Sequence, residues 1–433
     1  MDQALKLKKA TYHLYTFTIS KLISTFGAQV YAFAISFYIL QVTGSATSFA
    51  TNLVCNILPR TLASPFAGYM ADKYSKKKII IFSQIATTLT ILGLLGVTLT
   101  SGLSLPAIYV TTCILSLTSM LSGVTFTASI TGLIDKDRIQ RAMSLNQMSI
   151  SLAAIASPAV GGLMYGAVSM STFLIIYIGA SIVAVLLEAT MNFTLFVKRE
   201  KLEGEQPKET VWQSLKAGVS YLKLQPIVMT MIWIALLVNF LFGAFEVGYS
   251  FILIEKMKME SQHFGFTQGA FAIGMLLMSI YFSVRKEVKY PFLASKRGII
   301  GMGIIMGAIG VPVMIELPYY LILSYYILMM FSFGVMVMVV NTPLQVMLQK
   351  EIDDEYKGRV FSLLETMAMA LIPLGMVLYG FLYDVLPAQW ILVTSSIILI
   401  VGVLILARGS VVRKLHPQFG QDKNVKVEAG TVV

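Results

Sequence analysis

The feature that most constrains this chain is a series of long, nearly uninterrupted apolar runs. Roughly 20 apolar residues in a helix are enough to cross the hydrocarbon core of a bilayer. The 433 residues contain twelve runs of about that length or more. They cover residues 16–40, 46–71, 79–100, 107–133, 142–166, 171–196, 226–254, 264–284, 297–315, 318–348, 360–383 and 388–408.

The composition leads to the same class of protein. Hydrophobic residues make up 56% of the chain and charged residues 13%, and the mean hydropathy is +0.76. A water-soluble domain of this composition would expose apolar surface that it has no way to bury. The runs are continuous rather than alternating, which excludes a transmembrane β-barrel. We therefore predict an all-α membrane protein with twelve transmembrane helices.

Positive charge is distributed unevenly between the two sides of the predicted membrane. Of the 33 Lys and Arg, the two tails and the loops on the same side hold 29. The opposite loops hold Lys256 and Lys258, and two more, Lys21 and Arg60, lie within the runs. Because cytoplasmic loops are enriched in Lys and Arg, we expect both termini in the cytoplasm of a plasma membrane, most simply a bacterial one. The basic clusters set orientation and do not indicate nucleic-acid binding.

One polar stretch divides the runs into two sets of six. Residues 197–225 form the longest polar segment, in which Trp212, Leu215, Val219 and Leu222 share one helical face. This spacing favours a short amphipathic helix on the cytoplasmic membrane surface, with a solvated linker helix as the alternative. The expected organisation is a first six-helix bundle, a linker, a second six-helix bundle and a cytoplasmic tail, at residues 1–197, 198–225, 226–410 and 411–433.

The two halves share a recognisable segment. The first half reads DKDRIQRAMSLNQ and the second reads DDEYKGRVFSLLE, with Arg141 and Arg359 lying 218 positions apart. Each Arg follows acidic residues, precedes a Ser by three positions and leads into a run that contains Pro, Gly and a Tyr-Gly pair. A duplicated six-helix unit explains the match, so we expect two pseudo-symmetric bundles. Many secondary transporters are built from such repeats and hold substrate near the midplane.

The loop between the second and third runs carries the most specific motif. It begins at Gly68, continues through Asp72, and ends in a basic stretch that includes Lys76 and Lys77. This pattern resembles the loop motif of the major facilitator superfamily, in which Gly permits close helix approach. An Asp at a helix end, held by basic residues, can form a conformational latch between bundles, to which Arg141 and Arg359 would also belong. The plainer interpretation is an orienting basic loop with an incidental Asp.

A second motif lies in the fifth run, where Pro158 is followed by Gly161 and Gly162. Small residues allow helices to pack closely in lipid, and Pro removes one backbone hydrogen bond. The motif resembles the Pro-x-x-Gly-Gly element of exporter branches of the superfamily and indicates a gating helix. The family usually has Gly before the Pro, whereas this chain has Ser157, which weakens the antiporter assignment.

Residues 1–410 resemble the macrolide-efflux and enterobactin-exporter-like branch of the superfamily. The resemblance also rests on the stretches FYILQVTGSA and LQKEIDDEYKGRVFS. It implies a secondary active transporter without enzymatic activity or cofactor that works by alternating access. Many members carry an Arg in span four, but residues 113–126 contain none, so that part of the mechanism does not transfer.

Ionisable residues within the runs are the candidates for coupling and substrate binding, because each costs several kcal/mol unless it has a partner or water. Arg60 lies twelve residues before Asp72, and Glu188 ten residues before Lys198. Glu246 lies ten residues before Lys256, in a span that lines the cavity in this fold. Low-dielectric surroundings disfavour the charged form of a carboxyl, so Glu246 is the preferred proton-coupling residue. Glu188 is the next candidate, and Arg60 is a counter-ion or anion-recognising group.

Spans one, four, seven and ten would form the cavity wall in this fold. Its polar candidates are Gln29, Asn239, Asn341 and Gln345. Its apolar candidates are Tyr31, Phe33, Phe240, Phe242, Phe245 and Met336. A wall of aromatic, Met and amide side chains suits a large amphipathic ligand held without strict geometry.

The leading hypothesis is a monomeric, proton-coupled exporter of amphipathic small molecules such as macrolides, other drugs or siderophores. A lysolipid or glycolipid flippase of the same fold is the alternative, and an anionic headgroup would be favoured if Arg60 and Lys21 face the cavity. A membrane-embedded enzyme is a third class. The sequence does not favour this class, because it lacks clustered histidines, a metal-ligand spacing and a Ser/His/Asp set at one depth.

Overall fold

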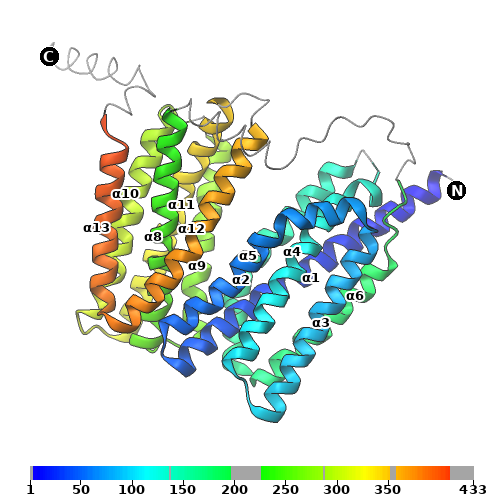
Figure 1. Cartoon of the computed structure of the whole chain (residues 1–433), viewed down its shortest axis with the longest axis horizontal. Helices are drawn as coiled ribbons and strands as arrows, with labels where there is room; N and C mark the ends of the chain where they lie inside the picture. The colour runs from blue at the N-terminus through cyan, green and yellow to red at the C-terminus, as the bar shows by residue number, and fades with distance from the viewer. Residues whose placement is uncertain (1–2, 136–137, 197–225, 286–287, 352–356, 410–433) are drawn as a thin grey trace. The chain divides into compact units, whose positions relative to one another are not determined.

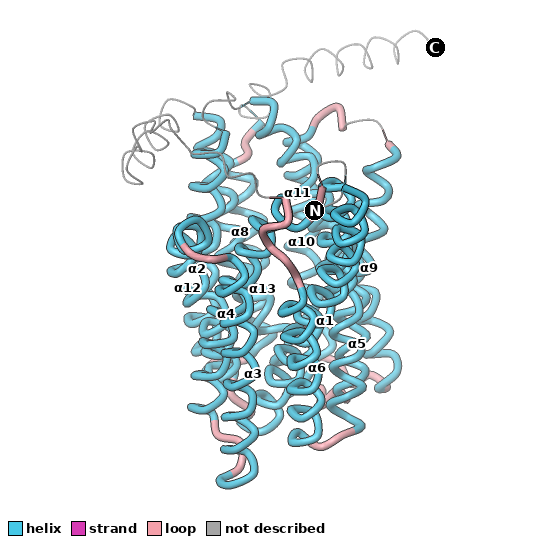
Figure 2. Tube along the Cα trace, turned by 90° about the vertical axis from the view of Figure 1, so that its right-hand side faces the viewer, coloured by secondary structure: helices cyan, strands magenta, loops and turns pink. Residues whose placement is uncertain are grey.

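The computed structural model describes residues 3–135, 138–196, 226–285, 288–351 and 357–409, apart from some side chains. Over these residues the chain is helical with short connections and contains no strand, as Figure 2 shows. The expected amphipathic linker helix and the tail from residue 411 lie outside the described residues, as do the side chains of Asp72 and Arg359.

The first half forms six long helices. Ser45 caps α2 by accepting a hydrogen bond from the Ser48 amide, and Ser169 caps α6 through the Thr172 amide in the same way. The helices are α1 (Gln3–Thr43), α2 (Ala46–Lys73), α3 (Lys76–Ser101), α4 (Leu105–Leu133), α5 (Ile139–Ala167) and α6 (Met170–Thr190).

The second half also contributes six long helices to the described residues. A short π-helical turn, Ile252–Lys256, follows the first of them. The helices are α8 (Pro226–Phe251), α9 (Ser261–Val284), α10 (Pro291–Ile309), α11 (Tyr319–Glu351), α12 (Lys357–Val385) and α13 (Ala388–Leu406).

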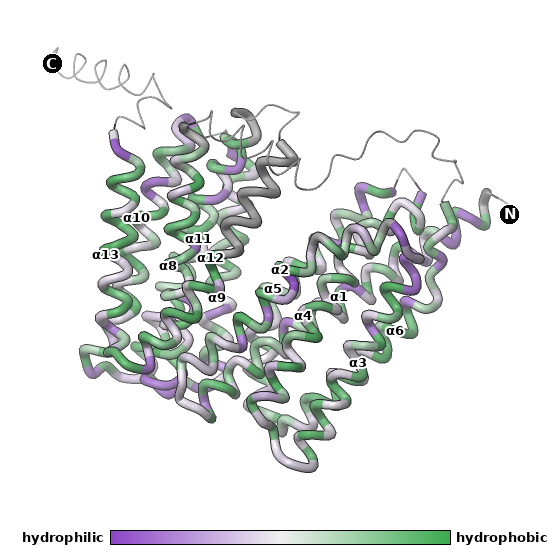
Figure 3. Tube along the Cα trace, in the orientation of Figure 1, coloured by the Kyte–Doolittle hydropathy of each residue, from purple (hydrophilic) through white to green (hydrophobic). Residues whose placement is uncertain are grey.

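Ten of these helices are long and apolar enough to cross a membrane. Figure 3 shows their mostly hydrophobic courses. In α12 the described residues include a shorter apolar stretch, Leu371–Val385. The predicted all-α membrane fold is therefore confirmed. The predicted end of α6 was wrong: α6 ends at Thr190, whereas the apolar run continues to residue 196, because the chain turns there and the Phe196 amide bonds the Gly132 carbonyl.

The chain divides into two compact units. The first contains residues 1–204 together with 253–269, and the second contains residues 205–252 and 270–433. The beginning of α9 therefore belongs to the first unit and the rest of α9 to the second. Figure 1 shows α1 to α6 gathered side by side within the first unit.

Within the first unit the helices pack mainly in the pairs α1 with α5, α2 with α4 and α3 with α6. At one end of α1 a cluster of buried side chains forms a local core, in which Leu14 and Phe17 pack with Phe126 and Ile130 of α4. The Phe17 and Phe126 rings meet edge to face with centroids 5.3 Å apart.

In the second unit, glycine residues allow neighbouring helices to pack closely. Its main pairs are α8 with α12, α10 with α11, and α10 with α13. At the first pair a Cβ on Gly243 would lie 2.7 Å from the Gly375 backbone, and a Cβ on Gly375 would strike the Phe240 carbonyl. Backbones approach this closely only where both helices lack a side chain, which is how helices commonly associate in lipid.

A pair of lysines gives structural support to the duplicated organisation. Lys77, at the start of α3, donates to the Ala189 carbonyl in the last turn of α6 over 2.7 Å. Lys296, near the start of α10, donates to the Ala407 carbonyl at the end of α13 over 2.6 Å. The lysines are 219 positions apart and the two carbonyls 218, which matches the spacing of Arg141 and Arg359. Both lysines satisfy a carbonyl that helix termini leave without an intrahelical partner.

Candidate functional site

Glu188 is a fully buried carboxylate in the last turn of α6. Its Oε1 accepts a 2.7 Å hydrogen bond from the Ser20 hydroxyl of α1, whereas its Oε2 has no hydrogen-bond partner among the described residues. The charge of Lys21 also acts on the carboxyl. Ten residues separate Glu188 from Lys198 in the sequence, but α6 ends only two residues after Glu188. Glu188 is shielded by packing, not by distance from the helix end.

A polar network lies between α1, α3 and α6. Gln84 accepts from Ser24 over 3.3 Å and donates to Ser181 over 3.0 Å, and Thr88 shares a 2.7 Å hydrogen bond with Ser181. Gln84 and Ser181 are buried. Sequence reasoning missed these residues because it considered ionisable groups and the amides of spans one, four, seven and ten, whereas Gln84 and Ser181 lie in spans three and six. An amide and hydroxyls spaced by one helical turn in an apolar run were the signal that could have indicated them.

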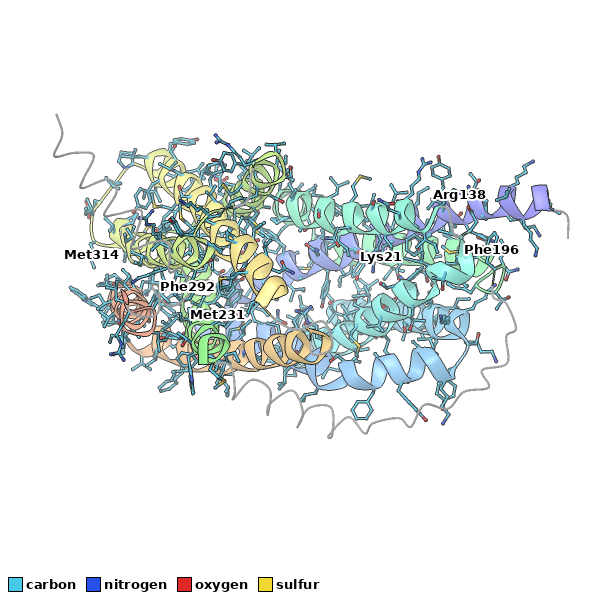
Figure 4. All side chains as sticks on the ribbon, turned by 90° about the horizontal axis from the view of Figure 1, so that it is seen from above. Lys21, Arg138, Phe196, Met231, Phe292 and Met314 are labelled. Atoms are coloured by element: carbon cyan, nitrogen blue, oxygen red, sulfur yellow. The ribbon has the colours of Figure 1, made fainter. Side chains whose placement is uncertain are left out.

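Lys21 and Arg60 are the basic residues that the sequence places within apolar runs. Arg60 is exposed near the middle of α2, about 20 Å from either end at 1.5 Å per residue. Lys21 is half-buried on α1, and its Nζ lies 6.0 Å from the centre of the Phe126 ring of α4. Figure 4 labels Lys21 among the helices of the first unit. No ion pair joins Arg60 to Glu188, whose hydrogen bond is to Ser20.

The glycines of α5 make two close contacts. A Cβ on Gly161 would lie 2.9 Å from the Phe33 ring of α1, and a Cβ on Gly162 would strike the Ser261 carbonyl at the start of α9. Ser261 also donates its hydroxyl to the Gly162 carbonyl over 2.9 Å. Both glycines are buried.

The contact between α5 and α9 is reciprocal. Gly265 of α9 lies so near α5 that a Cβ there would strike the carbonyl of Pro158, which stands inside α5. Glycines on both helices thus bring two backbones together along one seam within the first unit. Among the described residues, the Ser261 hydroxyl donates the hydrogen bond that crosses this seam, and no described ion pair crosses it.

Two basic residues of the loop motif donate to backbone carbonyls of neighbouring helices. Lys76 donates to the Ala128 carbonyl of α4 over 2.6 Å and Lys77 to Ala189 of α6, while Arg141 is exposed. Gly68 and Asp72 lie on α2, but their side-chain surroundings are outside the described part of the chain. The described lysines thus hold α3 against α4 and α6, and the latch stays a prediction.

Glu246 lies five residues before the end of α8 in the second unit and is half-buried. No hydrogen bond or ion pair to it occurs among the described residues. The neighbouring Phe245 stacks on Phe333 of α11 with ring centroids 3.9 Å apart, so α8 and α11 adjoin beside the carboxylate. A carboxylate without a polar partner in apolar surroundings is a group that gains by binding a proton or a cation.

The four amides proposed for the cavity wall differ in their surroundings. Asn341 and Gln345 are exposed one turn apart on α11, and neither side chain makes a hydrogen bond among the described residues. Asn239 donates to the Ala235 carbonyl of its own helix, and Gln29 accepts a 3.2 Å hydrogen bond from Ser157 of α5. Asn341 and Gln345 are therefore better placed to contact a ligand than Asn239 and Gln29.

Part of the proposed apolar wall is core packing. Tyr31, Phe33 and Phe245 are at most 6% exposed. Each contacts other rings, as Tyr31 does with Tyr177 and Phe33 with Phe264. The expectation that these three line an open cavity was therefore wrong, because an aromatic residue in an apolar helix satisfies helix packing as readily as ligand contact. Among the described residues, no three His, Cys, Asp or Glu side chains gather as a metal site would require.

These features define a polytopic helical membrane protein with a few polar and charged side chains inside its apolar helices. The sequence pattern of the Major Facilitator Superfamily matches residues 17–372, and the chain belongs to that superfamily. It is thus a transporter and a multi-pass protein of the plasma membrane, and the expected family resemblance is confirmed.

Its relatives include bacterial efflux proteins. The chain is 25% identical over 403 residues to the MFS-type transporter YfiS of Bacillus subtilis (strain 168), covering 91% of this chain and 92% of YfiS. It is 20% identical over 392 residues to macrolide efflux protein A of Streptococcus pyogenes, covering 90% of this chain and 94% of that protein. It is 23% identical over 216 residues to the enterobactin exporter EntS of Shigella flexneri, covering 48% of this chain and 47% of EntS.

The fold has a clear counterpart among solved structures. A mutant of the nucleoside transporter NupG superposes with a TM-score of 0.68 at 15% identity, over 91% of this chain and 99% of NupG. At this identity the likeness concerns the fold.

Proposed function

We propose that this transporter is a proton-coupled exporter of amphipathic small molecules that works by alternating access. The observation that carries the proposal is the reciprocal glycine seam between α5 and α9, built on Pro158, Gly162 and Gly265. Such a seam seals tightly by shape and separates without breaking ion pairs, as a gate must. Relatives that are macrolide and enterobactin exporters support the outward direction and the amphipathic cargo.

The proposed coupling residue is Glu246. Its half-buried position in α8, without a described polar partner, supports proton binding at one stage of the cycle. Asn341 and Gln345, exposed on the adjoining α11, would contact the cargo. Glu188 is the second candidate for coupling, although its hydrogen bond to Ser20 also suits a structural role.

The test is uphill export by purified protein in proteoliposomes with an imposed pH gradient. Glu246→Gln should abolish uphill transport and leave downhill exchange largely intact, because the amide keeps the shape but binds no proton. Glu316→Gln, in the exposed connection between α10 and α11, is the matched control and should transport normally. Full uphill transport by Glu246→Gln would move the coupling role elsewhere, with Glu188→Gln the next variant.

The latch at Asp72 is proposed separately from coupling. Asp72→Asn should leave the protein folded in the membrane and slow its turnover, because it weakens a contact made in one conformation without altering the cargo site. Wild-type turnover in this variant would remove the latch from the mechanism.

The alternative function is flipping of a lysolipid or glycolipid. The exposed Arg60 and the half-buried Lys21 favour it, because both could meet an anionic headgroup. Leaflet exchange of labelled lipid in the same proteoliposomes, without proton movement, would replace the exporter proposal.

A further inference from the structure

The register between α2 and α4 relates the depths of the two cations in the first unit. Asn52 of α2 accepts a 2.8 Å hydrogen bond from Thr112 of α4, and one turn later the Asn56 carbonyl accepts from Ser116. In both hydrogen bonds the residue number on α4 exceeds that on α2 by 60. Because the numbers increase together along both helices, α2 and α4 run parallel. The same offset carried onward places Gly123 of α4 beside position 63 of α2.

Lys21 reaches that level from α1. Its Nζ lies 3.9 Å from the position that a Cβ on Gly123 would take. Arg60 lies three residues before position 63 on α2, which corresponds to about 4.5 Å along a helix axis. Two positive side chains on neighbouring helices, which both pack against α4, therefore lie at nearly one depth in the membrane.

The charge balance at this level is positive. The apolar runs of the first half contain three charged residues, Lys21, Arg60 and Glu188. Glu188 is bonded to Ser20 and offsets part of the Lys21 charge, but no described ion pair includes Lys21 or Arg60. A charged side chain in the middle of a membrane helix is costly unless it meets water or a ligand of opposite charge. An exposed guanidinium and an ammonium at a similar depth on neighbouring helices suit a carboxylate, phosphate or sulfate.

We infer that Lys21 and Arg60 form an anion-binding subsite of the first unit, and that the cargo is an amphipathic molecule with a carboxylate, phosphate or sulfate group. This inference rests on the proposed transport function and narrows its substrate class from amphipathic molecules in general to amphipathic anions. The anionic group belongs either to a free metabolite or to a lipid headgroup, since both offer the same oxygens to the two cations.

Equilibrium binding to the full-length protein in lipid nanodiscs tests the subsite, with empty nanodiscs as the background. The probes are a naphthyl-alkyl carboxylate, the matched naphthyl-alkyl ammonium, and lysophosphatidylglycerol. Arg60→Gln and Lys21→Gln should each weaken binding of the anions on the order of tenfold, as loss of a charge-assisted hydrogen bond does. Binding of the ammonium probe should stay the same or improve.

Two further variants separate charge from packing. Arg60→Lys keeps the charge and should retain most of the anion affinity even if the forked geometry is lost. Lys8→Gln removes a positive charge from the exposed start of α1 and should change nothing. Preference for the carboxylate over lysophosphatidylglycerol indicates a free anion as cargo, and the reverse preference indicates a lipid headgroup.

The inference and the transport proposal fail in different ways. Equal anion affinity in wild type, Arg60→Gln and Lys21→Gln, or no anion binding by wild type, overturns the subsite whatever the transport result. Anion binding that depends on both cations, without any uphill export of the bound probe, supports the subsite and contradicts the exporter.

Discussion

Two equivalent helix pairs, α3 with α6 in the first unit and α10 with α13 in the second, are joined in different ways. In the first, Ser181 of α6 bonds Gln84 and Thr88 of α3 through their side chains. In the second, the positions 219 residues further along are Gly303 and Gly307. There Ser396 of α13 donates to the Gly303 carbonyl over 2.7 Å, and a Cβ on Gly307 would lie 3.0 Å from its hydroxyl.

The difference shows that one helix pairing can be stabilised by two kinds of contact. Directional side-chain hydrogen bonds keep α3 and α6 together with room for amide and hydroxyl groups. Close backbone approach keeps α10 and α13 together and depends on the absence of a Cβ. The first unit, with its internal polar groups, also contains the buried carboxylate of Glu188.

The largest loss of stability should come from replacing Gly303 of the second unit by glutamine, the residue at the equivalent position 84 of the first unit. Gly303→Gln forces a long side chain against Ile400, which already lies 2.7 Å from the position of a Cβ. We expect a loss of about 2–3 kcal/mol in stability, measured by thermal unfolding in detergent. Gly93→Gln is the control, since a Cβ at Gly93 of α3 meets nothing within 4 Å and its variant should unfold like wild type. Equal melting of the two variants would contradict the close-packing account.

Removing the serine hydroxyl at each of the two seams, Ser181 and Ser396, should have a smaller and unequal effect. Ser181→Ala leaves Gln84 and Thr88 without their common partner and should cost about 1 kcal/mol. Ser396→Ala removes a bond to a single backbone carbonyl and should cost about half as much. Unfolding of both variants in the same detergent provides the comparison, and a greater loss in Ser396→Ala would reverse our ranking of the two seams.

Removing the two equivalent lysines should have a similarly small effect and the most nearly equal one. Lys77→Met and Lys296→Met each leave one terminal carbonyl, Ala189 or Ala407, without its charged donor. We expect about 0.5–1 kcal/mol for each, as for cations at helix C-termini. Unfolding temperatures that differ widely between the two variants would show that the lysines are not equivalent parts of a repeat.

Much of the fold was predictable because membrane helices leave a strong signal. Long apolar runs specify helices almost directly, and the Arg141 and Arg359 segments indicate the repeat. The end of α6 was not predictable, because the turn after Thr190 and the position of Lys77 depend on tertiary contacts that hydropathy does not encode. The Lys77 and Lys296 pair became visible only after both lysines were seen to bond helix ends.

The candidate site was less predictable. Charged residues in apolar runs are conspicuous, so Arg60, Glu188 and Glu246 could be named from the sequence. Their partners could not, because which face of a helix a residue occupies depends on packing. Phe33 and Phe245 illustrate the same limit, since an aromatic side chain for the core and one for a ligand look alike in sequence.

The most direct test of proton-coupled export is substrate-dependent proton movement by the wild-type protein in liposomes with a pH gradient. Macrolides, lipophilic cations, siderophores and the anionic probes would each be added in turn while internal pH is followed. We expect at least one ligand to dissipate the gradient and to be driven uphill by it, with both effects absent in Glu246→Gln. Uphill transport that persists after the gradient is collapsed, or ligand movement without proton movement, would contradict the account.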